Sequence, residues 1–301
     1  MNRIRVKGNT WALEGKQLIG YYQVDEKSCI LLDAGKENER ADIEAALLEA
    51  GLSPVGLILS HMHYDHNENS RYFREKFGIP VAMPRGEAEI CRNEATLKNH
   101  LFCFTPGLIS QYPRLQNLIC PVDRPIEAEE TQIDFQGAIF EILHTPGHSP
   151  DHCSIVTPDG VCYLGDAIMC GNDLARSQIP FVFGVALDLE TKRAMRGYSY
   201  DRYIVPHYGI LEELSPVLEE NITLIEKQAA YMGSLITKPT TFCDCYAVIM
   251  EALEQASVHP IWNLHMERYL RPYIEYLIDT GVLTLAAGNG APTVAPRGWQ
   301  E

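Results

Sequence analysis

The sequence predicts a layered α/β fold followed by a smaller helical region, and three observations support this prediction. Strand-like patterns of apolar and polar residues fill residues 3–33 and return over residues 133–166. Between these regions a helix-like stretch leads into a short apolar run, which is the alternation of a layered α/β domain. After residue 211 the pattern changes to long amphipathic helices. We therefore expect one domain at residues 1–211 and a helical, winged-helix-like domain at residues 212–301.

The first half of the chain is expected to form strands, helices and a loop rich in histidine. Residues 3–33 are divided by turn signals at Gly8-Asn9 and Glu14-Gly15, and they end in a continuous apolar run. A helix is expected at residues 43–50, ended by Gly51, and a buried strand at residues 55–59. A further helix and strand are expected at residues 70–77 and 81–83.

Residues 98–120 lack a clear period but are rich in aromatic and apolar side chains. These are Leu101, Phe102, Phe104, Leu108, Ile109 and Tyr112. Long irregular segments in compact domains are often lids or binding loops. We expect this partly ordered insertion to lie over a cleft or against a partner subunit. The alternative is a satellite core packed on the C-terminal helices.

The second half of the chain returns to strands before it becomes helical. Strands are expected at residues 139–143, 154–156, 161–164 and 203–205, with a helix near residues 188–196. Helices are then expected at residues 214–232, after the capping pattern Thr241–Asp244, and at residues 264–280. A strand at residues 282–285 completes a helix, turn and strand order reminiscent of a winged helix. The tail from Ala287 is expected to be mobile.

Composition and charge indicate a soluble globular protein that avoids polyanions. The 301 residues are 46% hydrophobic and 22% charged, which is enough for a sizeable core and excludes general disorder. The net charge of −15 disfavours nucleic acid, and no apolar stretch has the length of a secretory signal or a membrane span. The nine cysteines are scattered and odd in number, so reduced thiols and a cytoplasmic location are expected.

The loop after the strand at residues 55–59 carries the strongest chemical signal. Three histidines and an aspartate occur within six residues: His61, His63, Asp65 and His66. Two histidines spaced two apart can project the same way and share one metal ion, while the adjacent pair can reach a second ion. Packing is a poor explanation, because His and Asp are costly to bury without partners.

Three further candidate ligands stand at the ends of other expected strands. They are His148 in Thr-Pro-Gly-His, Asp166 in Leu-Gly-Asp, and His207 in Pro-His. Each is weak alone, because a single strand-end histidine is more often a hydrogen-bonded structural residue. Taken in order with His-x-His-x-Asp-His, however, the four motifs resemble those of the metallo-β-lactamase superfamily. The resemblance spans residues 4–209.

The resemblance implies a fold and a ligand set. The fold is a four-layer αββα sandwich that carries two metal ions at one edge of its paired sheets. By this resemblance His61, His63 and His148 bind the first ion, Asp65, His66 and His207 bind the second, and Asp166 bridges both. One departure is that Asn67-Glu68-Asn69 replaces a small, usually glycine-containing segment of the family pattern.

Four other residues are expected to support the ligands or the substrate. Asp33 matches the superfamily's first motif, an acid that orders the metal loops, although Asp before Ala-Gly is also an ordinary turn residue. His144 and His152 flank His148 and are expected to make hydrogen bonds behind the ligands rather than to bind metal. Tyr208 either donates to a developing oxyanion or packs as an aromatic side chain.

The predicted ligands indicate hydrolysis. Imidazole and carboxylate ligands without cysteine suit Zn²⁺ best, with Fe or Mn as alternatives. Two such ions lower the pKa of a bridging water, so that a hydroxide attacks the substrate while Asp65 orients it. The sequence therefore predicts a binuclear metallohydrolase that acts on a small-molecule substrate. The oligomeric state stays open, and a homodimer is one option.

Several substrate and function classes stay open. Many true β-lactamases carry cysteine at the position of Asp166. With aspartate there, the chain resembles instead the branch that contains glyoxalase II-like thioesterases, lactonases and phosphodiesterases. Within that branch, the C-terminal helices resemble those of the hydrolases related to human β-lactamase-like protein 2, some of which cleave RNA. The negative charge favours an acyl substrate, a thioester or a lactone, over a phosphodiester. The other classes are a non-hydrolytic diiron protein and a metal-containing regulator whose last helix binds DNA.

Overall fold

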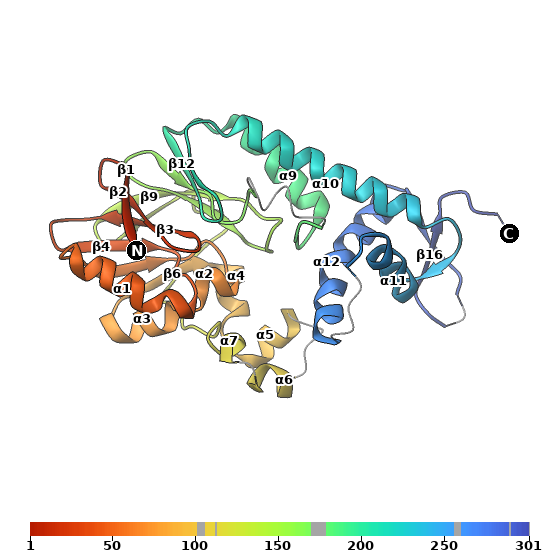
Figure 1. Ribbon diagram of the computed structural model, residues 1–301, viewed down its shortest axis with the longest axis horizontal. Coiled ribbons are helices and arrows are strands. Elements are labelled where there is room, and N and C mark those ends of the chain that lie inside the picture. Colours follow the sequence, from red (N-terminus) through yellow and green to blue (C-terminus); the bar gives the residue numbers. More distant parts are fainter. Residues whose placement is uncertain (101–105, 112, 170–178, 256–259, 289, 301) are drawn as a thin grey trace.

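The computed structural model describes the whole chain except residues 101–105, 112, 170–178, 256–259, 289 and 301 (Figure 1). Two β-sheets pack face to face, and helices cover the outer face of each sheet. This is the predicted four-layer α/β sandwich. The C-terminal helices continue from one outer helical layer and carry a small sheet of their own.

The first sheet contains seven strands in sequence order. They are β1 (Asn2–Lys7), β2 (Thr10–Glu14), β3 (Leu18–Gln23), β4 (Ser28–Leu32), β5 (Ser53–Ile58), β6 (Val81–Pro84) and β7 (Arg124–Ile126). Strands β1 to β4 pair antiparallel, whereas β4 to β7 pair parallel. Two helices cross over between the parallel strands, α1 (Arg40–Glu49) and α3 (Ser70–Phe77), and Gly78 ends α3 in the left-handed conformation.

The second sheet contains six strands in the order β13-β12-β11-β10-β9-β8. They are β8 (Gln132–Phe135), β9 (Ala138–His144), β10 (Cys153–Val156), β11 (Val161–Tyr163), β12 (Arg202–Val205) and β13 (Gly209–Leu211). Helix α9 (Val185–Ala194) precedes β12, which pairs parallel with β11, while the other neighbours are antiparallel.

Three apolar layers separate the four layers of secondary structure. In β4, Cys29 and Leu31 pack against the outer helices, whereas Ile30 and Leu32 face the second sheet. Likewise Val161 and Tyr163 of β11 face the first sheet, and Cys162 faces outward. This alternation explains why these strands are apolar on every residue, since both of their faces are covered. Cys29, Cys153 and Cys162 are buried in these layers, and their thiols are free, as the expectation of reduced thiols requires.

The described part of the insertion before β7 consists of short helices, where the sequence showed no clear period. Helices α5 (Glu94–His100), α6 (Pro106–Gln111) and α7 (Pro113–Gln116) follow α4 (Arg85–Ile90). Each spans only one or two turns, which is too short to show a periodic apolar face. Leu97, Leu118 and Cys120 pack into the outer core of the first sheet. The predictions for Leu101, Phe102, Phe104, Leu108, Ile109 and Tyr112 concern side chains outside the described part of the structure.

The C-terminal region has the predicted helices and an additional sheet. Helices α10 (Ser215–Leu235), α11 (Phe242–Ala252) and α12 (Pro260–Asp279) surround a sheet of order β14-β16-β15. Thr241 caps α11 as predicted, since its Oγ1 accepts the N–H of Asp244 at 3.1 Å. The prediction of a mobile tail was wrong, because Thr293–Pro296 forms the central strand β16 between β14 (Thr240–Thr241) and β15 (Leu283–Ala286).

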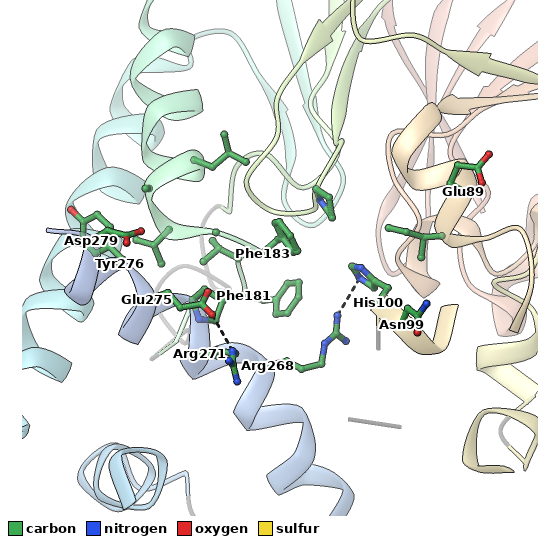
Figure 2. Close-up of a pocket in the computed structure, with 18 of the residues that line it drawn as sticks. Glu89, Asn99, His100, Phe181, Phe183, Arg268, Arg271, Glu275, Tyr276 and Asp279 are labelled. Atoms are coloured by element: carbon green, nitrogen blue, oxygen red, sulfur yellow. Dashed lines mark hydrogen bonds and ion pairs between the residues drawn. The ribbon is translucent and has the colours of Figure 1, made fainter. Parts of the chain in front are cut away.

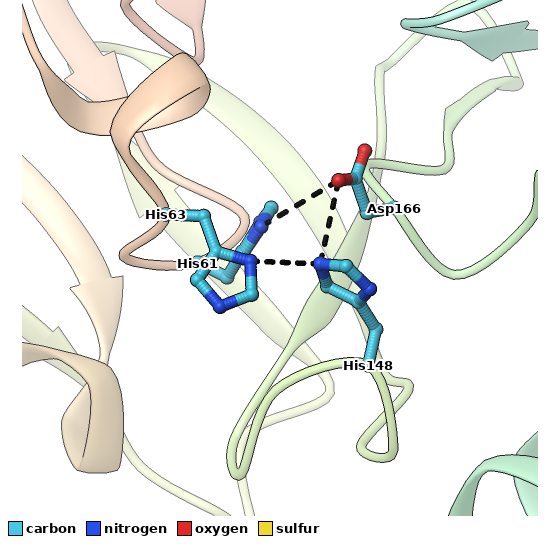
Figure 3. Close-up of side chains that lie close together, drawn as sticks. All are labelled: His61, His63, His148 and Asp166. Atoms are coloured by element: carbon cyan, nitrogen blue, oxygen red, sulfur yellow. Dashed lines mark hydrogen bonds and ion pairs between the residues drawn. The ribbon is translucent and has the colours of Figure 1, made fainter. Parts of the chain in front are cut away.

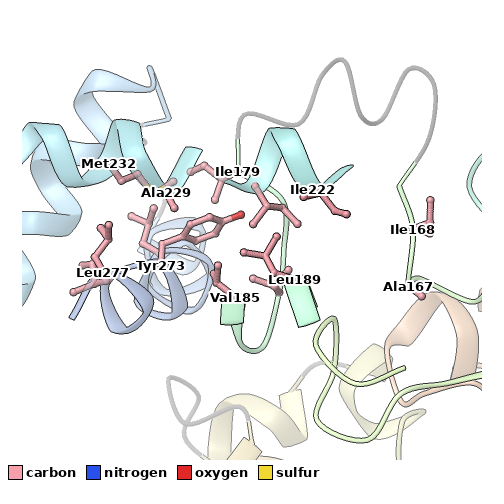
Figure 4. Packing of buried hydrophobic residues seen from close by; sticks show 14 of the residues in the cluster. Ala167, Ile168, Ile179, Val185, Leu189, Ile222, Ala229, Met232, Tyr273 and Leu277 are labelled. Carbon is pink, nitrogen blue, oxygen red and sulfur yellow. The ribbon is translucent and has the colours of Figure 1, made fainter. Parts of the chain in front are cut away.

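The outer core of the second sheet continues into the C-terminal helices (Figure 4). Leu189 of α9, Ile222 of α10 and Tyr273 of α12 belong to one buried cluster, and Tyr273 Oη donates to the carbonyl of Pro180 at 3.0 Å. The division at residues 211 and 212 therefore stays a prediction. None of the helices among the described residues has both the length and the apolar character needed to cross a bilayer.

Candidate metal centre

Four loops bring all seven predicted ligands to one edge of the paired sheets. His61, His63, Asp65 and His66 follow β5, the C-terminal end of a parallel strand. His63 is extended, and the short helix α2 (Tyr64–Asn67) begins after it. The other three ligands come from the second sheet: His148 from the loop between β9 and β10, Asp166 from the end of β11, and His207 from the end of β12.

The first cluster joins three imidazoles and one carboxylate (Figure 3). His63 Nδ1 lies 2.8 Å from His148 Nε2. His148 Nε2 lies 3.3 Å from Asp166 Oδ2, and His61 Nε2 lies 3.9 Å from the same oxygen. One donor atom from each of the four residues falls within 4.8 Å of all the others.

The second cluster uses the other oxygen of the same carboxylate. Asp166 Oδ1 lies 3.1 Å from His66 Nε2 and 3.3 Å from His207 Nε2. His207 Nε2 also lies 3.3 Å from Asp65 Oδ2, so these four residues again place one donor atom each within 4.8 Å of the rest. Asp166 thus presents one oxygen to each cluster.

The buried donor atoms of these clusters fit divalent cations. His61 Nε2, His66 Nε2 and Asp166 Oδ1 are buried, and none has a hydrogen-bond partner among the described residues. A buried polar atom without a partner costs roughly 1–3 kcal/mol. Such atoms, gathered in two groups, are the imidazole and carboxylate donors that a metal ion needs.

Asp33 lies behind two of the predicted ligands and fixes the orientation of their rings. Its buried carboxylate accepts four hydrogen bonds: from Ser60 N (2.7 Å), Ser60 Oγ (2.8 Å), His66 Nδ1 (2.7 Å) and Tyr163 Oη (2.9 Å). Because His66 Nδ1 donates to Asp33, Nε2 is the ring nitrogen that faces Asp166 and is available to a metal ion once it carries no proton. Ser60 Oγ donates to Asp33 and therefore accepts from His61 Nδ1 at 3.0 Å, which leaves Nε2 of His61 as an acceptor too.

His152 positions the backbone of Asp166. Its Nε2 accepts the backbone N–H of Asp166 at 3.1 Å, and its Nδ1 donates to Thr145 Oγ1 at 2.8 Å. His152 therefore makes hydrogen bonds behind a predicted ligand, which is where it was expected from the sequence. Gly165 makes this contact feasible: its φ is +53°, and a Cβ there would lie 2.6 Å from His152 Nε2 and 2.8 Å from Ser60 Oγ.

The other two predicted supporting residues lie apart from the ligands. His144 Nε2 donates to the carbonyl of Glu130 at 2.9 Å, so it ties β9 to the turn before β8 rather than to a ligand. Tyr208 is 54% exposed and is neither packed in the core nor in the cavity beside the clusters. Tyr208 therefore has neither of its two expected positions, packed as an aromatic side chain or lining the cavity as an oxyanion donor, whereas its neighbour His207 does line the cavity.

Glu87 of α4 is a supporting residue that the sequence did not reveal. Its buried carboxylate accepts from Met62 N at 3.2 Å, Ser149 Oγ at 2.7 Å and Asp151 N at 2.9 Å. It therefore joins the loop that carries His61 and His63 to the loop that carries His148. Burial raises the pKa of Glu87 to about 7. A single Glu after a strand has no local signal for such a contact.

The charges of the clusters are strongly coupled. Burial alone raises the pKa of Asp166, but His66, His207 and His148 outweigh it and hold that pKa well below its usual range. Burial and the neighbouring imidazoles lower the pKa of His61 far below its usual value. For His207, burial is outweighed by Asp166 and Asp65, which raise its pKa to about 9.

A cavity of about 570 Å³ opens beside both clusters. Ligands His63, Asp65, His148, Asp166 and His207 form one wall. Other lining residues come from the loops of the first sheet, the segment before α9 and helix α12: Lys36, Tyr64, Phe181, Arg268 and Tyr269. Helix α12 therefore contributes to the site, which its sequence did not show because the contact depends on packing across more than half of the chain.

Comparison with known proteins assigns the fold and the chemistry in outline. The profile of the metallo-beta-lactamase superfamily matches residues 14–207. The chain is 26% identical over 157 residues to hydroxyacylglutathione hydrolase GloC of Haemophilus influenzae, covering 52% of this chain and 68% of that protein. It is 25% identical over 276 residues to an atrochrysone carboxyl ACP thioesterase of Pseudocercospora fijiensis, covering 89% and 69%. A Thermus thermophilus metallo-beta-lactamase family protein superposes with a TM-score of 0.71 at 19% identity, covering 93% and 94% of the two chains.

Proposed function

Because the chain belongs to the metallo-beta-lactamase superfamily, we propose that it is a binuclear metallohydrolase of an acyl substrate, a thioester first and a lactone second. The observation that carries the binuclear part is the position of Asp166. Its two oxygens face two separate clusters, and each cluster contains three further ligands. A carboxylate shared in this way is the arrangement of paired-metal hydrolases.

The proposed ligands are the seven residues of the two clusters. His61, His63 and His148 serve one ion, Asp65, His66 and His207 serve the other, and Asp166 serves both. Five imidazoles and two carboxylates without a thiolate suit Zn²⁺, and Fe or Mn are the alternatives. Two such ions would lower the pKa of a bound water and would polarise the oxygen of a substrate.

The remaining steps belong to side chains of this chain. Asp65 lines the cavity and directs Oδ2 towards His207, so its carboxylate is placed to accept a proton and to orient the attacking water. Tyr269 lines the same cavity, so we assign to it the hydroxyl role that was expected of Tyr208. Arg268 and Lys36 also line the cavity, and their positive charges are placed to stabilise a carboxylate or a developing oxyanion on the substrate.

Two observations favour an acyl substrate. The two relatives above are named for hydrolysis of a hydroxyacylglutathione and of an acyl-carrier thioester. The net charge of −15 repels polyanions such as RNA. The alternative to an acyl substrate is a small phosphodiester. The observation that favours it is the positive charge of Lys36 and Arg268, which both line the cavity.

Metal analysis and a substrate panel test this proposal. We expect about two metal ions per chain in purified, undepleted protein. The panel contains an acyl thioester, a lactone, a β-lactam and bis(p-nitrophenyl) phosphate, and hydrolysis of the thioester is expected to be fastest. Asp166→Ala should lower the metal content and remove activity, whereas Asp134→Ala on exposed β8 is the matched control. Less than one metal per chain, or full activity of Asp166→Ala, would contradict the binuclear proposal.

A further inference from the structure

A second cavity of about 820 Å³ adjoins the metal cavity (Figure 2). It lies between α4 and α5 of the insertion, the segment leading into α9, and helix α12. The two cavities share Phe181 and Arg268 as lining residues. A substrate bound at the metal centre therefore has a second space directly beyond Phe181.

The lining of this second cavity is mainly apolar. Ile90, Pro150, Val182, Phe183 and Leu187 contribute hydrocarbon surface, which is typical of a ligand pocket of this size. Phe183 also stacks on His100, with ring centroids 6.4 Å apart. Buried apolar surface in such a pocket favours a hydrocarbon or aromatic group over a hydrated one.

The charged residues of the second cavity argue against an anionic occupant. Three acids line it: Glu89, Glu275 and Asp279. Arg271 is paired with Glu275 at 3.0 Å, and Arg268 donates to His100 Nε2 at 3.2 Å while its guanidinium lies 5.6 Å from the Phe181 ring. Glu89 is likewise paired with Arg92 at 3.1 Å, so most of these charges neutralise one another and leave little surplus positive charge for phosphates or several carboxylates. Such groups would lose their hydration without gaining partners, whereas an uncharged chain has no such cost.

We propose that the second cavity binds the apolar acyl chain of the substrate. This inference rests on the proposed function and adds the substrate class: a thioester with a medium-length or aromatic acyl group. The thioester carbonyl lies at the metal centre, the acyl chain passes Phe181 into the second cavity, and the thiol leaving group stays on the solvent side. Arg268 stands at the junction, where Figure 2 shows it between His100 and the Phe181 ring.

A blocking substitution tests the proposal. Ala186 on α9 lines the second cavity and is exposed, so Ala186→Trp fills the space without displacing a core residue. Ala194 is also exposed on α9 but lies outside the cavity lining, which makes Ala194→Trp the matched control. Both variants are compared with the parent protein on acetyl and octanoyl thioesters of N-acetylcysteamine.

The expected result is a change in chain-length preference. The parent protein should prefer the octanoyl thioester, and Ala186→Trp should lower kcat/KM for it by at least about ten-fold while the acetyl value stays within about two-fold. Ala194→Trp should leave both values unchanged. Equal effects of Ala186→Trp on both substrates, or no preference in the parent protein, would overturn the proposal.

A binding measurement separates this inference from the proposed function. Decanoate, a product-like carboxylate, should bind metal-loaded protein in calorimetry and should bind Ala186→Trp at least about ten-fold more weakly. If no thioester is hydrolysed but decanoate binding responds in this way, the proposed activity fails and the apolar site stands. If thioesters of both lengths are hydrolysed equally and decanoate does not bind, the activity stands and the apolar site is overturned.

Discussion

Substitution of Asp33 by Asn tests whether this carboxylate controls the metal-facing histidines. Asp33 adopts a φ of +64°, a left-handed conformation that Asn adopts readily, so the backbone is not strained by the change. All four partners of the carboxylate are donors: two groups of Ser60, His66 Nδ1 and Tyr163 Oη. The Asn side chain has one oxygen and one NH2 group in place of the two carboxylate oxygens. At least one of the four donors therefore faces another donor.

The magnitude follows from these contacts. Oδ1 of Asp33 accepts only Ser60 N, whereas Oδ2 accepts the other three bonds. The least costly orientation of Asn therefore places its amide against Ser60 N and loses one hydrogen bond to a charged acceptor, worth roughly 1.5–3 kcal/mol. The other orientation turns an N–H towards His66 Nδ1 and moves the ring proton to the metal-facing Nε2. Either way, metal affinity should fall by about 10- to 100-fold.

Two measurements check this prediction. Competition with a chelator gives the affinity of Asp33→Asn for Zn²⁺, and denaturant unfolding of metal-depleted protein gives the change in the free energy of unfolding. Exposed Asp134→Asn controls for the loss of one charge. An Asp33→Asn protein with parental metal affinity and parental stability would refute the assignment of Asp33 as the residue that orients the ligands.

Two further predictions concern residues that join the loops around the site. Glu87→Gln should destabilise the protein by roughly 1–3 kcal/mol in denaturant unfolding, because every partner of this buried carboxylate is a donor and an amide mispairs with one of them; unchanged stability would show that the loops do not depend on it. Burial and the nearby charge of Arg268 lower the pKa of His100 to about 4, below the value of about 6.5 in the unfolded chain. Because the unfolded chain takes up this proton first, the contribution of His100 to the free energy of unfolding is complete above about pH 6.5 and is lost as the pH falls towards 4. The melting temperature of the parent protein relative to His100→Gln should therefore decline between pH 7 and pH 4.5, and a constant difference would contradict this reasoning.

The fold and the ligands were predictable because their signals are local. The strands of the sandwich are short apolar runs bounded by turns, and His61, His63, Asp65 and His66 are adjacent in the sequence. Each remaining ligand follows an expected strand, and the order of motifs resembles a known family. The structure brings all seven to one sheet edge in the predicted two groups.

The missed features depend on contacts between distant segments. Strand β16 forms by pairing with β14 and β15, and its Val294 packs in the core of the C-terminal helices, so its short sequence by itself resembles a tail. Glu87 acts through loops that meet it only after the two sheets dock. Likewise, Arg268 and Tyr269 reach the cavity because α12 folds back over it, and no pattern within α12 indicates which of its residues face the ligands.

The two sheets share the ligands in a way that affects assembly. The first sheet contributes His61, His63, Asp65 and His66, and the second contributes His148, Asp166 and His207. Both clusters draw on both sheets, so neither half of the chain can offer a full coordination sphere by itself. If these residues bind metal as proposed, metal uptake requires that the two halves have docked, and bound metal stabilises the docked state. A chain opened in the turn before β8 would yield two fragments that metal ions help to reunite.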